Sequence, residues 1–319
     1  MKTYILGIDT SAYTTSIAIV NMYTGSIEFN LKKLLSVPAG QKGLRQQEAV
    51  FQHLNNFQEL LSTIDLDLSK VSIVSVSSRP RNIKNSYMPV FTVGQNYGKV
   101  IAKTLNCSYI EYSHQENHIS ASLIDSYKEI KDNILAIHIS GGTTEFLTAK
   151  KSNNGYDTEI VGGSKDITFG QLIDRIGTYM AFSFPCGLYM EEYIKDYSNF
   201  DKTNYPAITK SPYINLSGIE NYYKNLIDNN KYNKHSIIFS LFEYIAKCII
   251  NVVNILKENL KFKTIIITGG VAANSVIRNA ITEEYSTKYS VMFPSSTNSS
   301  DNAIGVAYLP IIDRWYNET

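Results

Sequence analysis

This 319-residue chain has few charged residues and almost no net charge. Charged side chains make up 18% of it, below the roughly 25% typical of soluble proteins. The 30 Lys and Arg nearly cancel the 29 Asp and Glu, which leaves a net charge of +1. The chain as a whole therefore has no strong attraction for nucleic acid or for an anionic membrane. Binding of a nucleic acid would need a local basic patch or a basic partner.

Cysteine is also rare, and the three cysteines are far apart in the sequence: Cys107, Cys186 and Cys248. This spacing excludes a CxxC metal or redox motif and a disulfide framework, so we expect a reducing, cytoplasmic environment. The apolar run before Asp9 is too short for a signal peptide. The longest apolar stretch, residues 237–256, contains a Glu and a Lys at helical periodicity. It predicts a buried helix rather than a membrane span.

A repeated pattern is the first positive feature. Residues 4–20 and 134–148 each show an apolar run, a small polar cluster and a second alternating run, which predicts a strand, a tight turn and a strand. A third apolar run at 264–268 enters Gly269-Gly270, and a helix is expected to begin near Ala273. Backbone N–H groups at such a turn suit an anionic or nucleotide ligand.

Together and in this order, the three units favour an α/β protein of two similar lobes with duplicated subdomains, the actin/hexokinase/Hsp70-like (ASKHA) fold. Any one unit alone is more often an ordinary buried strand followed by a turn. We expect lobe I to span residues 1–130, with the C-terminal segment 298–319 packing back on it. Lobe II is expected at 131–297 and is expected to bind the nucleotide.

The segment 113–118, SHQENH, is the most specific local signal. With Ser113 as the cap of a helix, His114 and His118 lie one turn apart on the same face, which suits two imidazoles on one metal ion. Glu116 points elsewhere and does not match the HExxH arrangement of metalloproteases. Asp301 is the best candidate for a third ligand, and two His with one carboxylate suit Fe, Zn or Mn. The alternative is a solvated histidine pair and a helix-capping aspartate.

A second group of residues suggests nucleotide binding. The loop Ser140-Gly141-Gly142-Thr143-Thr144 has small residues whose N–H and hydroxyl groups can cradle phosphate. Asp174 can accept hydrogen bonds from ribose hydroxyls, and Gly187 allows a base or sugar to approach the backbone. The alternative for this segment, residues 162–175, is an amphipathic helix whose Asp174 and Arg175 are merely exposed.

These motifs resemble one family when they are taken in order. The chain contains LGIDTS at 6–11, SHQENH at 113–118, ISGGTTEF at 139–146, DITFGQLIDRIG at 166–177, FPCG at 184–187, SG at 217–218, ITGGVAAN at 267–274 and SSDNAIGVAY at 299–308. The set is similar to the TsaD/Qri7/Kae-type family of tRNA threonylcarbamoyladenosine transferases, formerly labelled glycoproteases. The resemblance covers nearly the whole chain.

The resemblance implies the ASKHA fold and transfer of a threonylcarbamoyl group from its adenylate to N6 of an adenosine beside the anticodon of tRNA. It implies a divalent metal, ATP or threonylcarbamoyl-adenylate as ligand, and companion proteins such as a TsaB-like partner, or a homodimer, with no membrane. It places metal ligands at His114, His118 and Asp301. It places nucleotide contacts at Ile139, Ser140, Gly141, Gly142, Thr143, Asp174, Gly187 and Asn274.

The chain also departs from the family pattern. Tyr13 and Thr14 replace an acidic pair in the first loop, so the catalytic residues are left unassigned. Thr143 replaces a histidine, the family's HxEGH is HQENH, and a glycine-rich GPGL segment is replaced by SRPRN at 78–82. Residues 43–53 and 86–91 resemble a divergent paralogue branch of Firmicutes.

Three functions follow from these observations. The leading one is a threonylcarbamoyltransferase-like enzyme. The second is a catalytically degenerate paralogue that binds nucleotide and metal and regulates or binds a partner. The third, a metallopeptidase, rests only on the histidine pair, and the position of Glu116 speaks against it.

Overall fold

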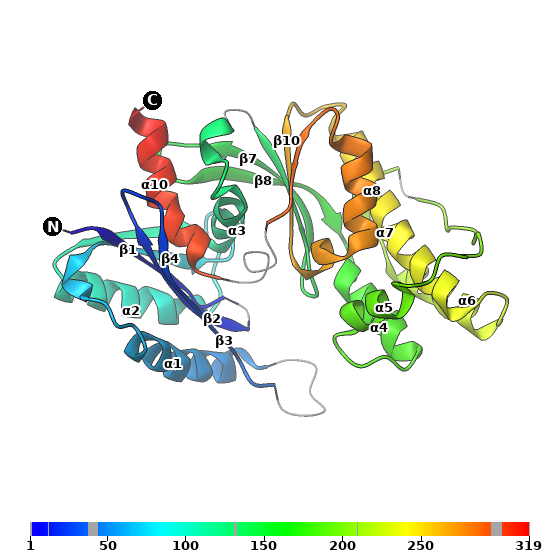
Figure 1. Ribbon diagram of the computed structural model, residues 1–319, viewed down its shortest axis with the longest axis horizontal. Helices are drawn as coiled ribbons and strands as arrows, with labels where there is room; N and C mark the ends of the chain where they lie inside the picture. Colours follow the sequence, from blue (N-terminus) through cyan, green and yellow to red (C-terminus); the bar gives the residue numbers. More distant parts are fainter. Residues whose placement is uncertain are drawn as a thin grey trace. The chain divides into compact units, whose positions relative to one another are not determined.

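The computed structural model describes residues 2–11, 13–37, 44–130, 133–208, 210–294 and 302–318. The chain forms two compact units, each with its own sheet. Unit 1 comprises residues 1–131, 151–157 and 297–319, and unit 2 comprises 132–150 and 158–296. Figure 1 shows the elements of both units, and each unit is described separately below.

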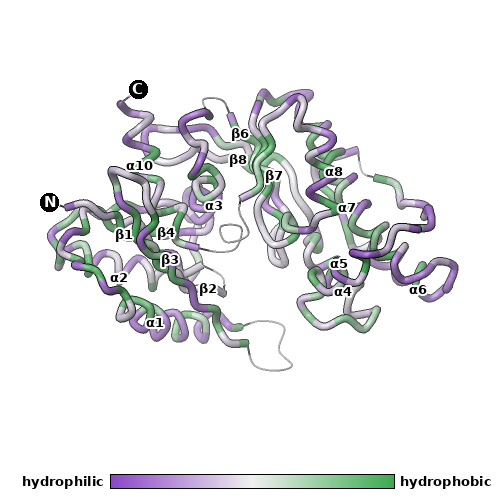
Figure 2. Tube along the Cα trace, in the orientation of Figure 1, coloured by the Kyte–Doolittle hydropathy of each residue, from purple (hydrophilic) through white to green (hydrophobic). Residues whose placement is uncertain are grey.

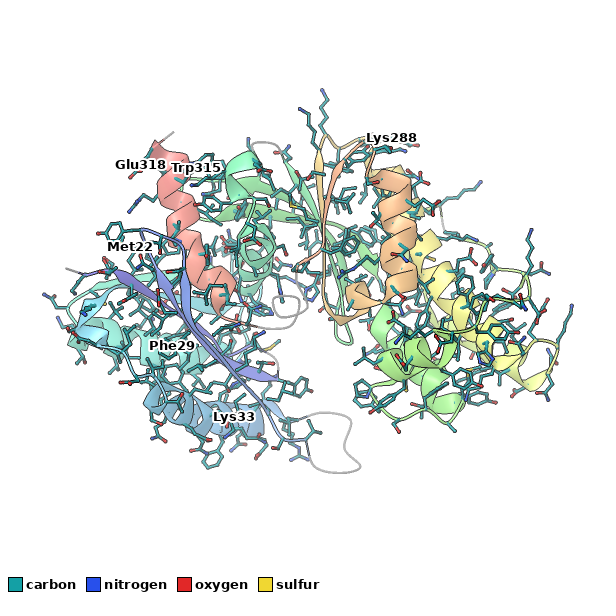
Figure 3. The ribbon with its side chains drawn as sticks, in the orientation of Figure 1. Met22, Phe29, Lys33, Lys288, Trp315 and Glu318 are labelled. Carbon is teal, nitrogen blue, oxygen red and sulfur yellow. The ribbon has the colours of Figure 1, made fainter. Side chains whose placement is uncertain are left out.

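Unit 1 is built on a five-stranded sheet in the order β3-β2-β1-β4-β5. Its strands are β1 (Tyr4–Asp9), β2 (Thr14–Asn21), β3 (Ile27–Leu34), β4 (Val71–Arg79) and β5 (Ser108–Ser113). Its helices are α1 (Gln46–Ser62), α2 (Phe91–Thr104), α3 (His114–Leu123) and α10 (Ile304–Glu318), with short 3-10 turns at Leu68–Lys70 and Tyr127–Glu129. In Figure 3 the side chains of Phe29 and Lys33 extend from β3, and Trp315 and Glu318 lie near the end of α10.

Unit 2 has a six-stranded sheet in the order β11-β10-β6-β7-β8-β9. Its strands are β6 (Ile134–Ile139), β7 (Thr144–Lys151), β8 (Tyr156–Ser164), β9 (Tyr213–Ile214), β10 (Thr264–Thr268) and β11 (Ser290–Met292). Its helices are α4 (Phe169–Tyr179), α5 (Cys186–Ile194), α6 (Ser217–Asp228), α7 (Lys234–Leu256) and α8 (Ser275–Tyr285), and a 3-10 turn spans Gly270–Ala273.

The two sheets repeat one pattern. β1 pairs antiparallel with β2 and parallel with β4, and β6 pairs antiparallel with β7 and parallel with β10. In the first sheet β3 lies beside β2 and β5 lies beside β4. In the second sheet β8 lies beside β7 and β11 lies beside β10 in the same way. The predicted strand, turn and strand repeat is therefore present in the structure, as is the third strand at 264–268 that enters a Gly-Gly turn.

The C-terminal helix packs directly on the first strand. A Cβ built on Gly7 of β1 would lie 2.5 Å from the carbonyl oxygen of Ala303 and 2.8 Å from Cβ of Ala307. Only a residue without a side chain allows this approach. Ser120 of α3 also donates a hydrogen bond to the Gly305 carbonyl at 2.8 Å, and Ser75 of β4 donates one to the Val306 carbonyl at 2.6 Å. The last helix is thus part of unit 1.

The apolar helix expected at 237–256 is α7. It is long and apolar enough to cross a membrane by composition, but 72% of its most apolar window is buried in the fold, as in a core helix. It belongs to the large apolar core of unit 2, which also holds residues of β6 and β10. Figure 2 shows the strands around β6 and β7 in the hydrophobic colours.

The turn between β7 and β8 belongs to unit 1, although both strands lie in the sheet of unit 2. Asp313 of α10 accepts hydrogen bonds from the Gly155 N–H at 2.9 Å and from the Tyr112 hydroxyl at 2.6 Å, and it pairs with Lys151 at 2.7 Å. Glu116 accepts a hydrogen bond from the Tyr156 N–H at 3.0 Å. Buried polar groups therefore fix this turn within unit 1.

Candidate functional site

The first part of the candidate site is the N-terminus of α3. Ser113 caps the helix: its hydroxyl accepts a hydrogen bond from the Glu116 N–H at 3.2 Å, while the Glu116 carboxylate accepts one from the Ser113 N–H at 2.7 Å. This reciprocal capping box fixes where the helix begins. It therefore fixes the direction of His114, the first helical residue.

The two histidines face each other. Nε2 of His114 and Nε2 of His118 are 2.9 Å apart, and the rings meet edge to face with centroids 4.3 Å apart. Nδ1 of His114 lies 2.9 Å from Oδ2 of Asp9, at the end of β1. Burial by itself raises the pKa of Asp9, but the charge and hydrogen bonds of His114 and the hydrogen bond of Ser11 outweigh it, so the pKa is lowered. Asp9 is thus an ionised carboxylate behind the imidazole.

This arrangement fits a metal site. At the metal–nitrogen distances of about 2.0–2.1 Å that are usual for imidazole, two nitrogens 2.9 Å apart can bind the same ion. A carboxylate on the other ring nitrogen is the common support of a metal-binding histidine. The third predicted ligand, Asp301, lies outside the described residues. Within the described ranges, no three His, Cys, Asp or Glu side chains come together as a metal site.

Sequence reasoning missed two residues of this site, Asp9 and Asn117. Asn117 is buried, and its Nδ2 donates hydrogen bonds to Asp9 Oδ2 at 2.8 Å and to the Asn302 carbonyl at 2.6 Å. Its Oδ1 accepts a hydrogen bond from the Val306 N–H at 2.7 Å. Asn117 therefore joins β1, α3 and the start of α10. The available signal was a carboxylate directly after the first strand and an amide between the two histidines.

Glu116 is held by hydrogen bonds within the fold. Both of its oxygens accept backbone N–H groups, and Arg79 lies 3.8 Å from Oε2. Burial raises the pKa of Glu116, and these hydrogen bonds and Arg79 oppose the rise. The carboxylate is hydrogen-bonded to Ser113 and Tyr156 and is not directed to the histidine pair. A general base on metal-bound water would have to point toward the histidine pair.

The second part of the candidate site is the turn between β6 and β7 in unit 2. Ser140 Oγ accepts hydrogen bonds from the N–H groups of Gly142 at 3.3 Å and Thr143 at 3.1 Å, so the turn has a defined shape. A Cβ built on Gly141 or on Gly142 would have no atom within 4 Å. The glycines thus leave open space for a ligand beside a turn whose own hydrogen bonds hold its shape.

Two glycines let neighbouring segments approach this turn. A Cβ on Gly170, at the start of α4, would lie 2.5 Å from the Ser140 carbonyl oxygen. Gly269 has φ of +95°, and a Cβ there would lie 2.2 Å from the Ile139 carbonyl oxygen. The end of β6, the start of α4 and the Gly-Gly turn after β10 therefore come together in unit 2.

Asp174 and Gly187 are also close to each other. Oδ1 of Asp174 on α4 accepts a hydrogen bond from the Cys186 N–H at the start of α5, at 2.8 Å. Burial raises the pKa of Asp174, and the Cys186 N–H opposes this in part. Around Gly187, the nearest atom to an added Cβ is 3.7 Å away. A half-buried carboxylate and an uncrowded backbone thus stand at the α4–α5 junction.

Asn274 is buried and serves as the cap of α8. Its Oδ1 accepts a hydrogen bond from the Ile277 N–H at 3.1 Å, and its Nδ2 donates one to Glu191 of α5 at 3.2 Å. Glu191 also accepts a hydrogen bond from the Ser275 N–H at 2.7 Å. These bonds tie α8 to α5. All the nucleotide residues implied by the sequence therefore lie in unit 2.

The first loop, where the family pattern has acidic residues, has no carboxylate side chain here. Tyr13 is 43% exposed, and its carbonyl accepts a hydrogen bond from the Leu35 N–H at 2.8 Å. Thr14 is buried at the start of β2.

The comparisons with known proteins decide the family. The model of the tRNA N6-adenosine threonylcarbamoyltransferase family (TsaD) matches residues 44–308. The chain belongs to this family. Its members are named as acyltransferases that act on tRNA, and the recognition made from the ordered motifs is confirmed.

The relatives are distant but span the chain. A tRNA N6-adenosine threonylcarbamoyltransferase of Mycoplasmopsis synoviae is 26% identical over 95% of this chain and 96% of its own length. A probable bifunctional tRNA threonylcarbamoyladenosine biosynthesis protein of Methanococcus vannielii is 25% identical over 96% of this chain and 53% of its own length. The latter joins a region similar to this chain to a further region.

Solved structures confirm the fold class. Component A of the (R)-2-hydroxyglutaryl-CoA dehydratase of Acidaminococcus fermentans superposes with a TM-score of 0.56 at 15% identity, over 98% of both chains. A ROK family glucokinase of Streptomyces griseus superposes with a TM-score of 0.52 at 11% identity, over 96% of this chain and 98% of the other. The chain has the two-lobed ASKHA architecture that was predicted.

Proposed function

We propose that this protein transfers a threonylcarbamoyl group from threonylcarbamoyl-adenylate to N6 of an adenosine in tRNA, in the cytoplasm. The observation that carries the proposal is the family match across residues 44–308. The facing histidines and the open glycine turn give the proposal residues that suit a metal and an adenylate.

In this proposal the nucleotide part of the donor binds to unit 2. The phosphate occupies the open space beside Gly141 and Gly142 in the 139–143 turn, the Asp174 carboxylate accepts hydrogen bonds from ribose hydroxyls, and Gly187 leaves room for the adenosine. Asn274 holds α8 against α5 through Glu191 and so shapes the same region. These contacts orient the donor before the reaction.

His114, His118 and Asp301 would hold a divalent metal in unit 1. When bound, such an ion supplies Lewis-acid activation of a carbonyl or neutralisation of a phosphate. With a metal bound, Asp9 would accept a hydrogen bond from Nδ1–H of neutral His114, which leaves the Nε2 lone pair for the ion. Asn117 holds Asp9 in this position.

The transfer forms a bond between N6 and the carbamoyl carbon and breaks the bond from that carbon to the phosphate oxygen. AMP leaves with the electron pair, and its phosphate or solvent water takes the proton released from N6. N6 of adenine is a weak nucleophile, so positioning of donor and acceptor contributes most of the rate. The first loop offers no carboxylate to receive the N6 proton. Family-type companion proteins, or a second copy of the chain, would help to present the tRNA, given the net charge of +1.

One observation favours a second candidate function. Tyr13 and Thr14 stand where the family pattern has an acidic pair, which suits a paralogue that binds nucleotide and metal, has lost transfer, and regulates or binds a partner. Both candidates bind adenine nucleotide, so nucleotide binding does not distinguish them. A test of the transfer reaction does.

A rescue experiment separates the two. The gene is expressed in a strain depleted of its own transferase, and ATP and ADP binding by the purified protein is measured by calorimetry. The enzyme is expected to restore growth and the modified nucleoside. Tight nucleotide binding without rescue would favour the paralogue, and failure to bind any nucleotide would contradict both.

A further inference from the structure

The loop between β4 and α2 stands where the family pattern is rich in glycine. In this chain it has the sequence SRPRNIKNSY over residues 78–87. It belongs to a longer stretch, residues 71–110, that contains five Lys and Arg and no Asp or Glu. Two of the five, Arg79 and Lys99, face the carboxylates of Glu116 at 3.8 Å and Glu111 at 3.3 Å, so the exposed positive charge of the loop comes from Arg81 and Lys84.

The loop is fixed next to the histidine pair. The Pro80 carbonyl accepts a hydrogen bond from the N–H of Gln115, the residue after His114, at 3.2 Å. At the other end, the Val90 carbonyl accepts a hydrogen bond from Thr10, the residue after Asp9, at 2.9 Å. Both ends of the loop are thus joined to neighbours of the candidate metal site within unit 1.

Hydrogen bonds also hold the loop's own shape. The Arg81 N–H donates to Ser86 Oγ at 3.0 Å, and the Ser86 N–H donates to the Ile83 carbonyl at 3.2 Å. Asn85 takes the left-handed conformation with φ of +66°, which asparagine tolerates well in turns. The Asn82 side chain donates to the Tyr156 carbonyl at 2.9 Å. The loop is therefore organised before a partner binds.

Its outward side chains have the chemistry of an RNA-binding surface. Arg81 and Lys84 are exposed, and in the described part of the chain Lys84 has no ion-pair partner. Tyr87 is 69% exposed and Ile83 is 55% exposed. Cationic side chains bind phosphates, and an exposed aromatic ring stacks on an unpaired base. An acidic peptide would account for the two cations of the loop. It would give no role to the exposed aromatic ring beside them.

We propose that the loop of residues 81–87 binds single-stranded RNA beside the histidine site, with Arg81 and Lys84 on phosphates and Tyr87 stacked on an unpaired base. The inference rests on the proposed function, because it takes the RNA to be the anticodon loop of the acceptor tRNA. It adds a binding surface that belongs to this chain's own sequence at 78–87.

The test measures RNA binding without donor or metal, so that its outcome does not depend on transfer. An unmodified tRNA transcript is titrated with the full-length protein at several salt concentrations. The variants are the double substitution Arg81→Gln/Lys84→Gln and the single substitutions Tyr87→Ala and Tyr87→Phe. The matched control is Lys70→Gln/Lys103→Gln, which removes the same charge from exposed positions before β4 and at the end of α2. Thermal unfolding checks that each variant is folded.

We expect the Arg81→Gln/Lys84→Gln protein to bind about 10- to 100-fold more weakly at low salt, with a salt dependence shallower by about 1.4, which corresponds to two phosphate contacts on a single strand. Tyr87→Ala should weaken binding about 5- to 100-fold without changing that slope, and Tyr87→Phe should restore it. The control pair should bind as the wild type does.

A second transcript sharpens the test. When an oligonucleotide complementary to the anticodon loop is annealed to the tRNA, its bases are paired and the effect of Tyr87→Ala should disappear. Three results would overturn the inference. The loop and control variants could lose the same RNA affinity, neither could lose any, or the wild type could show no salt-dependent RNA binding. If the loop variants lose RNA binding but no protein transfers the group, the inference stands and the proposed function fails. If transfer proceeds and the loop variants bind RNA normally, the proposed function stands and this inference fails.

Discussion

The two candidate binding regions of this protein are built in opposite ways. The histidine pair of unit 1 is surrounded by buried polar groups, and Asp9 and Asn117 connect it to β1 and α10. The glycine turn of unit 2 is open, with nothing near the positions where side chains would stand at Gly141 and Gly142. In the proposed function the first region would hold an ion at fixed nitrogens, and the second would admit a larger anionic ligand. Substitutions should therefore affect the two regions differently.

The largest effect is expected at the histidine pair. His118→Ala removes one of the two facing nitrogens and should weaken binding of Zn²⁺, used as the test ion, by about 100-fold or more, while Asp9→Asn should cost about 10- to 100-fold. Metal titration of the purified protein measures both. His235→Ala, which removes an imidazole stacked between Tyr193 and Tyr197 in unit 2, is the control. Equal zinc affinity in the His118 and His235 variants would refute the site.

Asn117 should control stability. Asn117→Ala removes three hydrogen bonds: those to the Val306 N–H and the Asn302 carbonyl, and one of the several that Asp9 accepts. We therefore expect a loss of about 2–4 kcal/mol in the free energy of unfolding. Denaturant titration measures it. Asn317→Ala, which removes one exposed hydrogen bond to the Asn153 carbonyl, should change stability little. A similar loss in both variants would contradict the role of Asn117.

In unit 2, two glycine substitutions separate ligand space from fold. Gly141→Ala should leave the unfolding temperature unchanged, because its Cβ meets nothing within 4 Å, yet weaken adenine nucleotide binding by about 1–3 kcal/mol by filling the ligand's space. Gly170→Ala should reduce both stability and binding, because its Cβ would collide with the Ser140 carbonyl. Calorimetry with ATP and thermal unfolding give the two readings. Nucleotide binding by Gly141→Ala at the wild-type affinity would exclude this turn as the phosphate site.

The smallest effect is expected at Asp166, whose carboxylate accepts the N–H groups of Leu216 and Ser217 at the start of α6. Burial opposes ionisation, but the hydrogen bonds from Leu216, Ser217 and Ile167 outweigh it and hold the pKa of Asp166 below its ordinary 3.8. A lowered pKa contributes stability above pH 3.8 that is lost as the pH falls below it. Asp166→Asn should therefore cost about 1 kcal/mol near neutral pH.

The pH dependence provides the control for Asp166. The difference between wild type and Asp166→Asn should narrow as the pH is lowered through 3.8. Asp196→Asn, at an exposed position in the same unit, is the matched control and should change stability little near neutral pH. A gap that stays constant down to acid pH would mean that the effect of Asp166 does not come from its charge.

The sequence predicted the parts of this fold that depend on local pattern. The repeated strand, turn and strand at 4–20 and 134–148, the helix cap at Ser113 and the buried helix near 237–256 all follow from spacing over a few residues, and the structure has each of them. The ordered motifs were also enough to identify the family.

What the sequence could not predict depends on contacts between distant residues. Asp9 meets His114 across 105 positions, and Asn117 reaches Val306 across 189. The turn at 151–157 joins unit 1 through Asp313, although the strands on either side belong to the sheet of unit 2. No periodicity or local motif encodes such pairings, because they arise only when the sheet and the last helix are assembled.

The most direct test of the account is a reconstituted transfer reaction. Purified protein, threonylcarbamoyl-adenylate, a divalent metal and an unmodified acceptor tRNA are combined with and without the companion proteins, and the nucleosides are analysed by mass spectrometry. The account predicts N6-threonylcarbamoyladenosine with the wild type and its loss with His118→Ala. Unmodified adenosine in every reaction, beside an active reference transferase, would contradict it.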